Sequence, residues 1–418
     1  MRIVHISWEY PPLVYGGLGR HVGALATAQA RAGHDVTVIT QTEAHPVDER
    51  LDGVRVVRHP RDPADLEFRA DTMLRWVTGL NRALESGVER VAADGPVDVI
   101  HGHDWMVTRP VATAQLAMHA PVVATLHATE AGRHQGWLPN EISRAVHSAE
   151  WDLAHRATRV IACSAAMGSE VRRLFRLPAE SVVVIPNGID LAQWRVDDHA
   201  RAEARRTYAG SGPLIVFAGR IEWEKGVHAL IDAMRQVSRV DPTARLVVAG
   251  RGGREAALRT QAAESGLGET VHFTGWLPES ELHALVAAAD VAVVPSLYEP
   301  FGLVALEAAA LGTPLVVART GGLAEIADEG RVAMTFTPDD PSDLTRVLVR
   351  TLADPEAAAS RARAARADLE TVYNWELIAA QTVAAYESAA ASWDGRTGPS
   401  PAPVIGSGNL LAVGPSAD

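Results

Sequence analysis

The sequence predicts an α/β protein of two Rossmann-like domains that face each other across a cleft. The first observation is length: the chain has 418 residues, beyond the size at which a single hydrophobic core normally stops growing. The second is that short apolar runs alternate with helical stretches, which is typical of parallel sheets covered by helices on both faces. The third is that this alternation restarts after the polar segment 197–212, whose glycine- and serine-containing end is predicted to be a linker.

The strands expected in the first half are short and apolar throughout, as strands buried on both faces are. They are Ile3–Ser7, Val36–Thr40, Val97–His101, Val122–Leu126, Val160–Cys163 and Val182–Ile185. A glycine-containing loop follows the first strand, and a helix is expected from Leu18 to Ala32, where Gly33 ends it.

The second half repeats the pattern, with a helix expected from about Val227. Its strands are Leu214–Ala218, Leu246–Ala249, Val271–Thr274, Val291–Val294 and Leu315–Ala318. Residues 338–390 have helical composition, and the chain then becomes rich in Gly, Pro and Ser. We therefore expect domains at 1–195 and 196–370, a last helix at 371–393, and a disordered tail at 394–418.

Charge and cysteine content exclude some classes of protein. The 51 acidic residues outnumber the 39 basic ones, which argues against the broad basic face that nucleic-acid binding requires. Cys163 is the only cysteine, so an intramolecular disulfide is excluded and a reducing cytoplasm is favoured. Neither a signal peptide nor a membrane span is visible, so we expect a cytoplasmic protein without stable membrane insertion. For the oligomeric state, a homodimer is one alternative.

The strongest motif begins at Glu299 and ends at Glu307, directly after the strand Val291–Val294. Its two carboxylates bracket a turn in which Gly302 permits close backbone approach before a helix begins. The first N–H groups of that helix and the carboxylates suit an oxygen-rich ligand. The alternative is that Glu307 merely caps the helix or lies on its solvated face.

A second motif, Gly219 to Gly226, also lies between a strand and a helix. Its Arg220 and Lys225 can both meet a diphosphate, the first as a planar fork and the second as a mobile point charge. Two such cations would neutralise a leaving diphosphate without a metal. The alternative is that both pair with Glu222 and Glu224 on the surface.

Two weaker signals come from the first half. Gly16 and Gly17 precede the first helix, where uncovered backbone N–H groups would form an anion site; the spacing does not fit a dinucleotide fingerprint. Histidines follow two strands, and a metal site formed by His101, His103 and His127 is one interpretation. A sugar site with Trp105 or Trp137 stacked on a ring is the other. We expect no metal.

These blocks, in this order, resemble the retaining glycosyltransferases of family 4, which have the GT-B fold and include glycogen synthase-like enzymes. The resemblance covers about Met1 to Trp393 and is greatest to actinobacterial α-(1→4)-glucosyltransferases of glycogen or methylglucose lipopolysaccharide synthesis. The blocks that carry it are Trp8–Pro12, Gly16–Val22, His127–Gly132 and Tyr298–Glu307.

The resemblance implies a nucleotide-sugar donor and a role for each matching residue. Gly16 and Gly17 would face the donor diphosphate, and Arg220 and Lys225 would bind it. Glu299 would lie near C1 of the donor sugar, Phe301, Gly302 and Leu303 would offer backbone N–H groups, Glu307 would hold the ribose, and His127 would contact the glucose. The catalytic set is thus His127, Arg220, Lys225 and Glu299. The helix around Trp375–Ala390 would cross back onto the N-terminal domain.

Acidic and aromatic side chains on the loops of the first half suit hydroxyl bonding and ring stacking in an acceptor groove. They are Glu9, Tyr10, Asp104, Trp105, Arg133, His134 and Trp137. The alternative is that the tryptophans belong to an interdomain core.

The expected activity is transfer of glucose from ADP- or UDP-glucose to an α-(1→4)-glucan. Glucose 1-phosphate is the rival acceptor, as in an α-maltose-1-phosphate synthase, and Arg133 and His134 would then grip its phosphate. A non-catalytic nucleotide-sugar sensor, and an epimerase or phosphorylase, are further alternatives.

Overall fold

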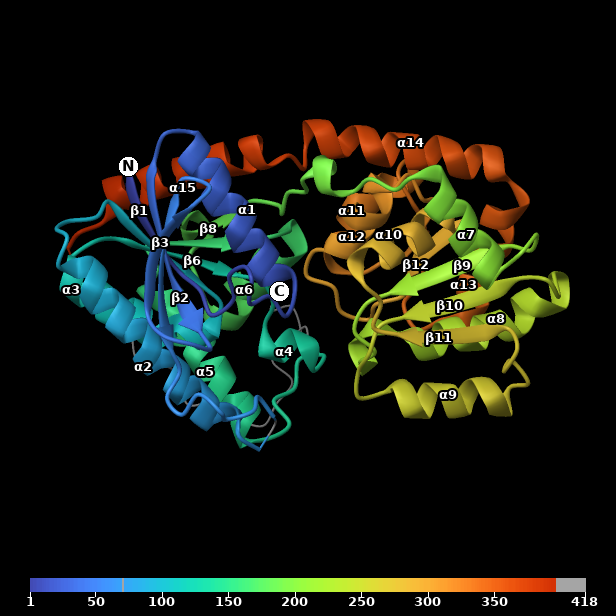
Figure 1. Ribbon diagram of the computed structural model, residues 1–418, viewed down its shortest axis with the longest axis horizontal. Helices are drawn as coiled ribbons and strands as arrows, with labels where there is room; N and C mark the ends of the chain where they lie inside the picture. The colour runs from blue at the N-terminus through green and yellow to red at the C-terminus, as the bar shows by residue number, and fades with distance from the viewer. Residues whose placement is uncertain (70, 396–418) are drawn as a thin grey trace, which may run out of the picture. The chain divides into compact units, whose positions relative to one another are not determined.

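The computed structural model describes residues 1–69 and 71–395, which form two compact α/β units (Figure 1). The first unit comprises Met1–Asn187 and the chain from Trp375 onward, and the second comprises Gly188–Asn374. The units therefore divide after Asn187, eight residues before the boundary expected at 195. Of the tail expected at 394–418, all but Asp394 and Gly395 lies outside the described residues.

The sheet of the first unit has the strand order β3-β4-β2-β1-β5-β6-β7-β8. Only β3 is antiparallel to its neighbour; the other pairs run parallel. The strands are β1 (Arg2–Ile6), β2 (Asp35–Thr42), β3 (Val47–Leu51), β4 (Val54–Pro60), β5 (Val99–His103), β6 (Val122–Leu126), β7 (Arg159–Ala162) and β8 (Val182–Val184).

Helices cover both faces of this sheet. Helices α1 (Gly17–Arg31) and α15 (Trp375–Ser392) pack together on one face, while α2 (Met73–Ala92), α3 (Thr108–Met118) and α5 (Glu141–Arg156) lie on the other (Figure 1). The short α4 (Glu130–Arg133) follows β6, and α6 (Ala165–Phe175) follows β7. The helix expected near the end of the chain thus belongs to the first unit.

The sheet of the second unit is parallel throughout, with the order β11-β10-β9-β12-β13-β14. Its strands are β9 (Leu214–Ala218), β10 (Arg245–Ala249), β11 (Val271–Gly275), β12 (Val291–Val294), β13 (Leu315–Ala318) and β14 (Met334–Phe336). Its helices are α7 (Asp198–Tyr208), α8 (Val227–Val240), α9 (Glu255–Glu264), α10 (Glu279–Ala288), α11 (Leu303–Ala310), α12 (Gly321–Ala327), α13 (Pro341–Ala353) and α14 (Pro355–Thr371).

Both sheets have the doubly wound order in which the chain reverses its direction of winding at one pair of central strands. That pair is β9 and β12 in the second unit and β1 and β5 in the first. Ligands of such sheets bind beyond the carboxyl ends of the two strands at this switch point. The loops that follow β1, β5, β9 and β12 are therefore the places to look for function.

Several local expectations were wrong. The predicted linker 197–212 contains helix α7, because the Asp197 carboxylate accepts the N–H groups of His199 and Ala200 and caps it. The missed edge strand β3 is largely exposed and lacks an apolar pattern. His101 and His103 lie within β5 rather than in a loop after it, because that strand begins two residues later than expected. Among the described residues, no helix is long and apolar enough to cross a bilayer.

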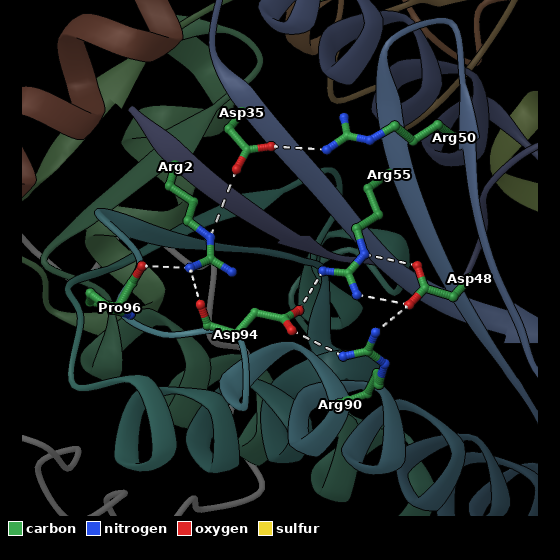
Figure 2. Close-up of polar contacts among 8 residues, drawn as sticks. All are labelled: Arg2, Asp35, Asp48, Arg50, Arg55, Arg90, Asp94 and Pro96. Atoms are coloured by element: carbon green, nitrogen blue, oxygen red, sulfur yellow. Dashed lines mark hydrogen bonds and ion pairs between the residues drawn. The ribbon is translucent and has the colours of Figure 1, made fainter.

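An ionic cluster joins β1, β2, the β3–β4 hairpin and the end of α2 in the first unit (Figure 2). Arg55 lies at its centre, with Nη2 2.8 Å from the Asp48 carboxylate and Nη1 2.6 Å from the Asp94 carboxylate. Arg90 contacts both aspartates as well. Hydrogen bonds to Arg55 lower the pKa of the Asp48 and Asp94 carboxyls below the usual range.

We expect Arg55→Met to lower the urea midpoint of unfolding at pH 7, because methionine keeps the packed stem but removes the charge. The effect depends on pH. Carboxyls whose pKa is lower in the folded state stabilise it above their unfolded pKa of about 4 and lose this contribution as the pH falls through the folded pKa. The difference in urea midpoint between the variant and the wild type should therefore become smaller at acidic pH. Arg50→Met is the control, since Arg50 is exposed and makes only a 3.7 Å ion pair with Asp35 and a 3.3 Å hydrogen bond to the Gly53 carbonyl among the described residues; an equal loss in both variants would contradict the prediction.

Candidate active site

A cation–carboxylate pair bridges the two loops at the switch point of the second unit. Lys225, in the loop after β9, donates from Nζ to Oε2 of Glu299, in the loop after β12, over 2.7 Å. The Ser296 hydroxyl donates to the same oxygen over 3.0 Å. The Lys225 and Glu299 side chains are 20% and 12% exposed, so both are held in place yet still reachable from solvent.

The backbones of these loops are fixed by close approach. The N–H of Leu297 donates to the Glu224 carbonyl over 2.7 Å. Gly226 has φ of +66°, and a Cβ there would come within 1.9 Å of the Pro295 carbonyl oxygen, so only glycine fits. The Glu299 carbonyl accepts the N–H of Gly322 over 3.0 Å. The carboxylate of Glu299 therefore stands on a rigid frame.

The double-glutamate motif has the arrangement expected from the sequence. Gly302, with φ of +112°, precedes α11, which starts at Leu303. Phe301 is buried, with its ring 6.0 Å from that of Tyr373. The N–H groups at the start of α11 form the kind of site that accepts oxygen ligands.

Glu307 lies in the second turn of α11, so it is not the helix cap. With apolar residues of α10, α11, β9 and β12 it lines a small pocket. Trp194 and His283 also line this pocket, and their rings are 4.3 Å apart. The Glu307 carboxylate thus lies at the wall of a mainly apolar hollow, and a carboxylate there can accept hydrogen bonds from hydroxyl groups.

Arg220 is arranged as in the alternative interpretation, in which it pairs with a neighbouring glutamate on the surface. Its guanidinium is 55% exposed and pairs with Glu224 over 3.0 Å. Lys225 does not pair with Glu222 or Glu224 in this way. It is also the only lysine in the sequence, and all the other lysine-or-arginine positions are arginines. A compact ammonium, rather than a guanidinium, therefore faces Glu299 at this position.

At the switch point of the first unit, the Glu9 carboxylate binds the backbone of the glycine loop. Its Oε2 accepts the N–H groups of Tyr15 and Gly16 over 2.9 Å and that of Gly19 over 3.3 Å. The expectation that the N–H of Gly16 is uncovered is therefore wrong, since an internal carboxylate occupies the start of α1. Burial raises the pKa of Glu9 above its usual value, although these three hydrogen bonds act to lower it.

Asp104 and His127 meet at the ends of β5 and β6. Oδ1 of Asp104 accepts the His127 N–H over 2.7 Å, and Asp104 has φ of +61°. Such strained residues cluster at functional sites. Burial raises the pKa of Asp104 to about 6 and lowers that of His127 to about 4. His127 is therefore a neutral imidazole at pH 7, suited to hydrogen bonding rather than to carrying charge.

Among the remaining acceptor-side candidates, all but one are exposed or partly exposed. Trp137 is 51% exposed, Arg133 and His134 are exposed, and His134 contacts Glu130 over 3.1 Å. Trp105, in the short turn after Asp104, is partly exposed. Tyr10, by contrast, is buried in the core of the first unit, with the Arg58 guanidinium over its ring, and does not offer a ring face to a sugar.

Sequence reasoning missed three functional candidates. Ser296 follows β12 directly, but an isolated serine gives no signal until its bond to Glu299 is known. Glu150 is 2% exposed, accepts the Glu130 N–H over 2.8 Å, and has a pKa raised well above the usual range by burial. His21 lies on the first turns of α1 and is treated below.

Two family models match the chain: "Glycosyltransferase Family 4" at residues 15–193 and "Glycosyl transferases group 1" at residues 201–368. Together with two doubly wound sheets and polar residues at their switch points, these matches define a glycosyltransferase. Glycogen synthase of Mycobacterium tuberculosis is 42% identical over 93% of this chain and 95% of that protein. The chain belongs to this glycogen synthase-like group of glycosyltransferase family 4.

Two further comparisons agree with this membership. Alpha-maltose-1-phosphate synthase of Mycolicibacterium smegmatis is 30% identical over 94% of this chain and all of that protein. The structure of sucrose-phosphate synthase from Thermosynechococcus elongatus superimposes with a TM-score of 0.80, at 24% identity over 94% of this chain and all of that one. The latter likeness concerns the fold, which is GT-B.

Proposed function

We propose that this enzyme transfers glucose from ADP- or UDP-glucose to the non-reducing end of an α-(1→4)-glucan, with retention at C1. The observation that carries the proposal is the Lys225–Glu299 pair at the switch point, beside the start of α11. A diphosphate leaving group needs a fixed positive charge, and a reacting sugar needs a fixed hydrogen-bonding group next to it.

In the proposed reaction, the acceptor hydroxyl oxygen forms the new bond to C1 on the face from which the C1–phosphate bond breaks. The hydroxyl proton passes to an oxygen of the departing diphosphate. Lys225 and Arg220 stabilise the charge that develops there, helped by N–H groups at Phe301, Gly302 and Leu303. Glu299 is hydrogen-bonded by Lys225 and Ser296, so we assign it to positioning the glucose rather than to nucleophilic attack, which glycosidases use.

The remaining roles follow from the chemistry of each side chain. Glu307, on the wall of the pocket beside α11, is assigned to the ribose hydroxyls. His127, neutral because of burial, is assigned to the hydroxyls of the transferred glucose. Gly17 is assigned to the diphosphate, and Asp104, Trp105 and Trp137 to the acceptor side. Glu9, which accepts the N–H of Gly16, acts by shaping the glycine loop.

The second candidate acceptor is glucose 1-phosphate. It is favoured by the exposed Arg133 and His134, which can bind a phosphate, and by the likeness to alpha-maltose-1-phosphate synthase. The glucan acceptor is favoured by the higher identity to glycogen synthase. A non-catalytic sensor would not need the Lys225–Glu299 pair.

A matrix of ADP-, UDP- and GDP-glucose against maltooligosaccharides and glucose 1-phosphate tests the proposal by product mass. We expect maltooligosaccharides to grow by whole glucose units, with release of nucleoside diphosphate. A product formed only from glucose 1-phosphate would overturn the glucan proposal and favour the second candidate. Release of no diphosphate with any pair would favour the sensor.

We also propose that transfer needs no divalent metal, because Lys225, Arg220 and backbone N–H groups supply the positive potential at the diphosphate. Activity measured after removal of metal with a chelator should stay at or above its initial value. Loss of activity that magnesium or manganese restores would contradict this prediction.

A further inference from the structure

Three histidines of the first unit form a group that the transfer reaction does not explain. His21 lies on α1, His103 ends β5, and His127 follows β6 directly. Each offers a ring nitrogen, and these three atoms lie within 4.8 Å of one another. The ring centroids of His21 and His127 are 4.7 Å apart, and those of His103 and His127 are 5.8 Å apart. The sequence suggested His101 as the partner of His103 and His127; the structure places His21 there.

Hydrogen bonding separates this group from the neighbouring histidines. His101 is fully bonded, with Nδ1 2.7 Å from the Tyr386 hydroxyl and Nε2 2.7 Å from the Thr125 hydroxyl. In contrast, both ring nitrogens of His21, Nδ1 of His103 and Nε2 of His127 are buried without a bonded partner among residues 1–69 and 71–395. Buried polar atoms are nearly always bonded to protein, water or an ion. Their convergence therefore points to a bound species.

The hydrogen bonds also determine which nitrogen of His103 is free to coordinate. Oε1 of Gln29 can only accept, so Nε2 of His5, 2.8 Å away, carries the proton. Nδ1 of neutral His5 then accepts from Nε2 of His103 over 3.0 Å. Nδ1 of neutral His103 consequently has a free lone pair. Fixing the tautomer of a ligand histidine through its other nitrogen is a general feature of metal sites.

We propose that His21, His103 and His127 form a binding site for a divalent transition metal, with Zn²⁺ the expected ion. Three imidazoles with an open fourth position are a common zinc arrangement, and imidazole sets select transition metals over Mg²⁺ or Ca²⁺. Zinc–nitrogen bonds of about 2.1 Å place the nitrogens of a tetrahedral site about 3.4 Å apart, so the three rings must move closer together than their present separation of up to 4.8 Å.

A bound ion would change the chemistry of this face. It would take the Nε2 of His127, so zinc should inhibit glucosyl transfer. This consequence rests on the proposed role of His127, whereas the metal site itself does not. The ion would have no part in stabilising the diphosphate.

The experiment titrates the metal-free full-length protein with Co²⁺, whose visible absorption reports a four- or five-coordinate nitrogen site, and then displaces it with Zn²⁺. We expect one site per chain. His21→Leu should abolish the absorption, and His5→Phe, which removes the bond that sets the tautomer of His103, should weaken binding by roughly 10- to 100-fold. His45→Gln, an exposed histidine, is the matched control and should bind as wild type does.

Wild-type protein that shows no such absorption at stoichiometric Co²⁺ would overturn the proposal, as would full binding by His21→Leu. Circular dichroism of each metal-free variant establishes that it is folded. If His21→Leu is not, His127→Leu replaces it and is read by cobalt absorption alone. Because absorption does not depend on turnover, a failed metal site and a failed glucosyltransferase assignment are distinguishable.

Discussion

Lys225→Ala is expected to lower turnover by about 100- to 1000-fold while the protein remains folded, because removal of one preorganised charge-stabilising donor costs roughly 2.7–4 kcal/mol of barrier. The ammonium lies 2.7 Å from Glu299, so its loss removes both the proposed diphosphate contact and the group that positions this carboxylate. Arg220→Ala should also reduce turnover, by a smaller factor, because Arg220 is exposed and its guanidinium must leave Glu224 before it binds a phosphate. Steady-state rates measure both effects.

The single lysine of the chain makes a sharper test available. Lys225→Arg should not restore activity, because a planar guanidinium does not fit the place of a compact ammonium bonded to Glu299. An amine-directed reagent should inactivate the enzyme by modifying Lys225, and nucleoside diphosphate should protect it. Arg235→Ala, an exposed position on α8, is the control. Rates within threefold of wild type for Lys225→Ala would contradict the assignment of Lys225 to the diphosphate.

The two glutamates of the strongest motif are expected to have separable effects. Glu299→Gln should reduce kcat by roughly 100-fold with little change in donor KM, since Glu299 acts next to the reacting carbon. Glu307→Gln should mainly weaken donor binding, by about tenfold or more, because a hydrogen bond to a charged group contributes roughly 1.5–3 kcal/mol. Kinetics separate kcat from KM, and calorimetry measures the affinity for nucleoside diphosphate.

Glu264→Gln, on the exposed face of α9, is the matched control for these two variants. Glu307→Gln that binds free nucleoside diphosphate as tightly as wild type would show that Glu307 does not hold the ribose. Glu299→Gln with unchanged kcat would remove Glu299 from the catalytic set.

The sequence alone predicted the doubly wound architecture and most of its central strands. Those strands are continuous apolar runs bounded by glycine, proline or polar residues, and the strands Leu214–Ala218, Val291–Val294 and Leu315–Ala318 have the expected bounds. Such runs leave few local alternatives, because strands buried on both faces need apolar side chains at every position. Edge strand β3 and helix α7 were missed, since exposed polar segments do not carry that signal.

The sequence by itself also identified the loops that hold the donor-side candidates, because glycines and charged residues after strands are local features. Only the tertiary structure decided what these residues contact. Lys225 binds Glu299, 74 residues away, instead of a neighbouring glutamate, and Glu9 closes the start of α1. His21 joins His103 and His127, although α1, β5 and β6 are far apart in the chain. These contacts follow from strand order and side-chain direction, which place distant residues at the same end of a sheet and which no local pattern encodes.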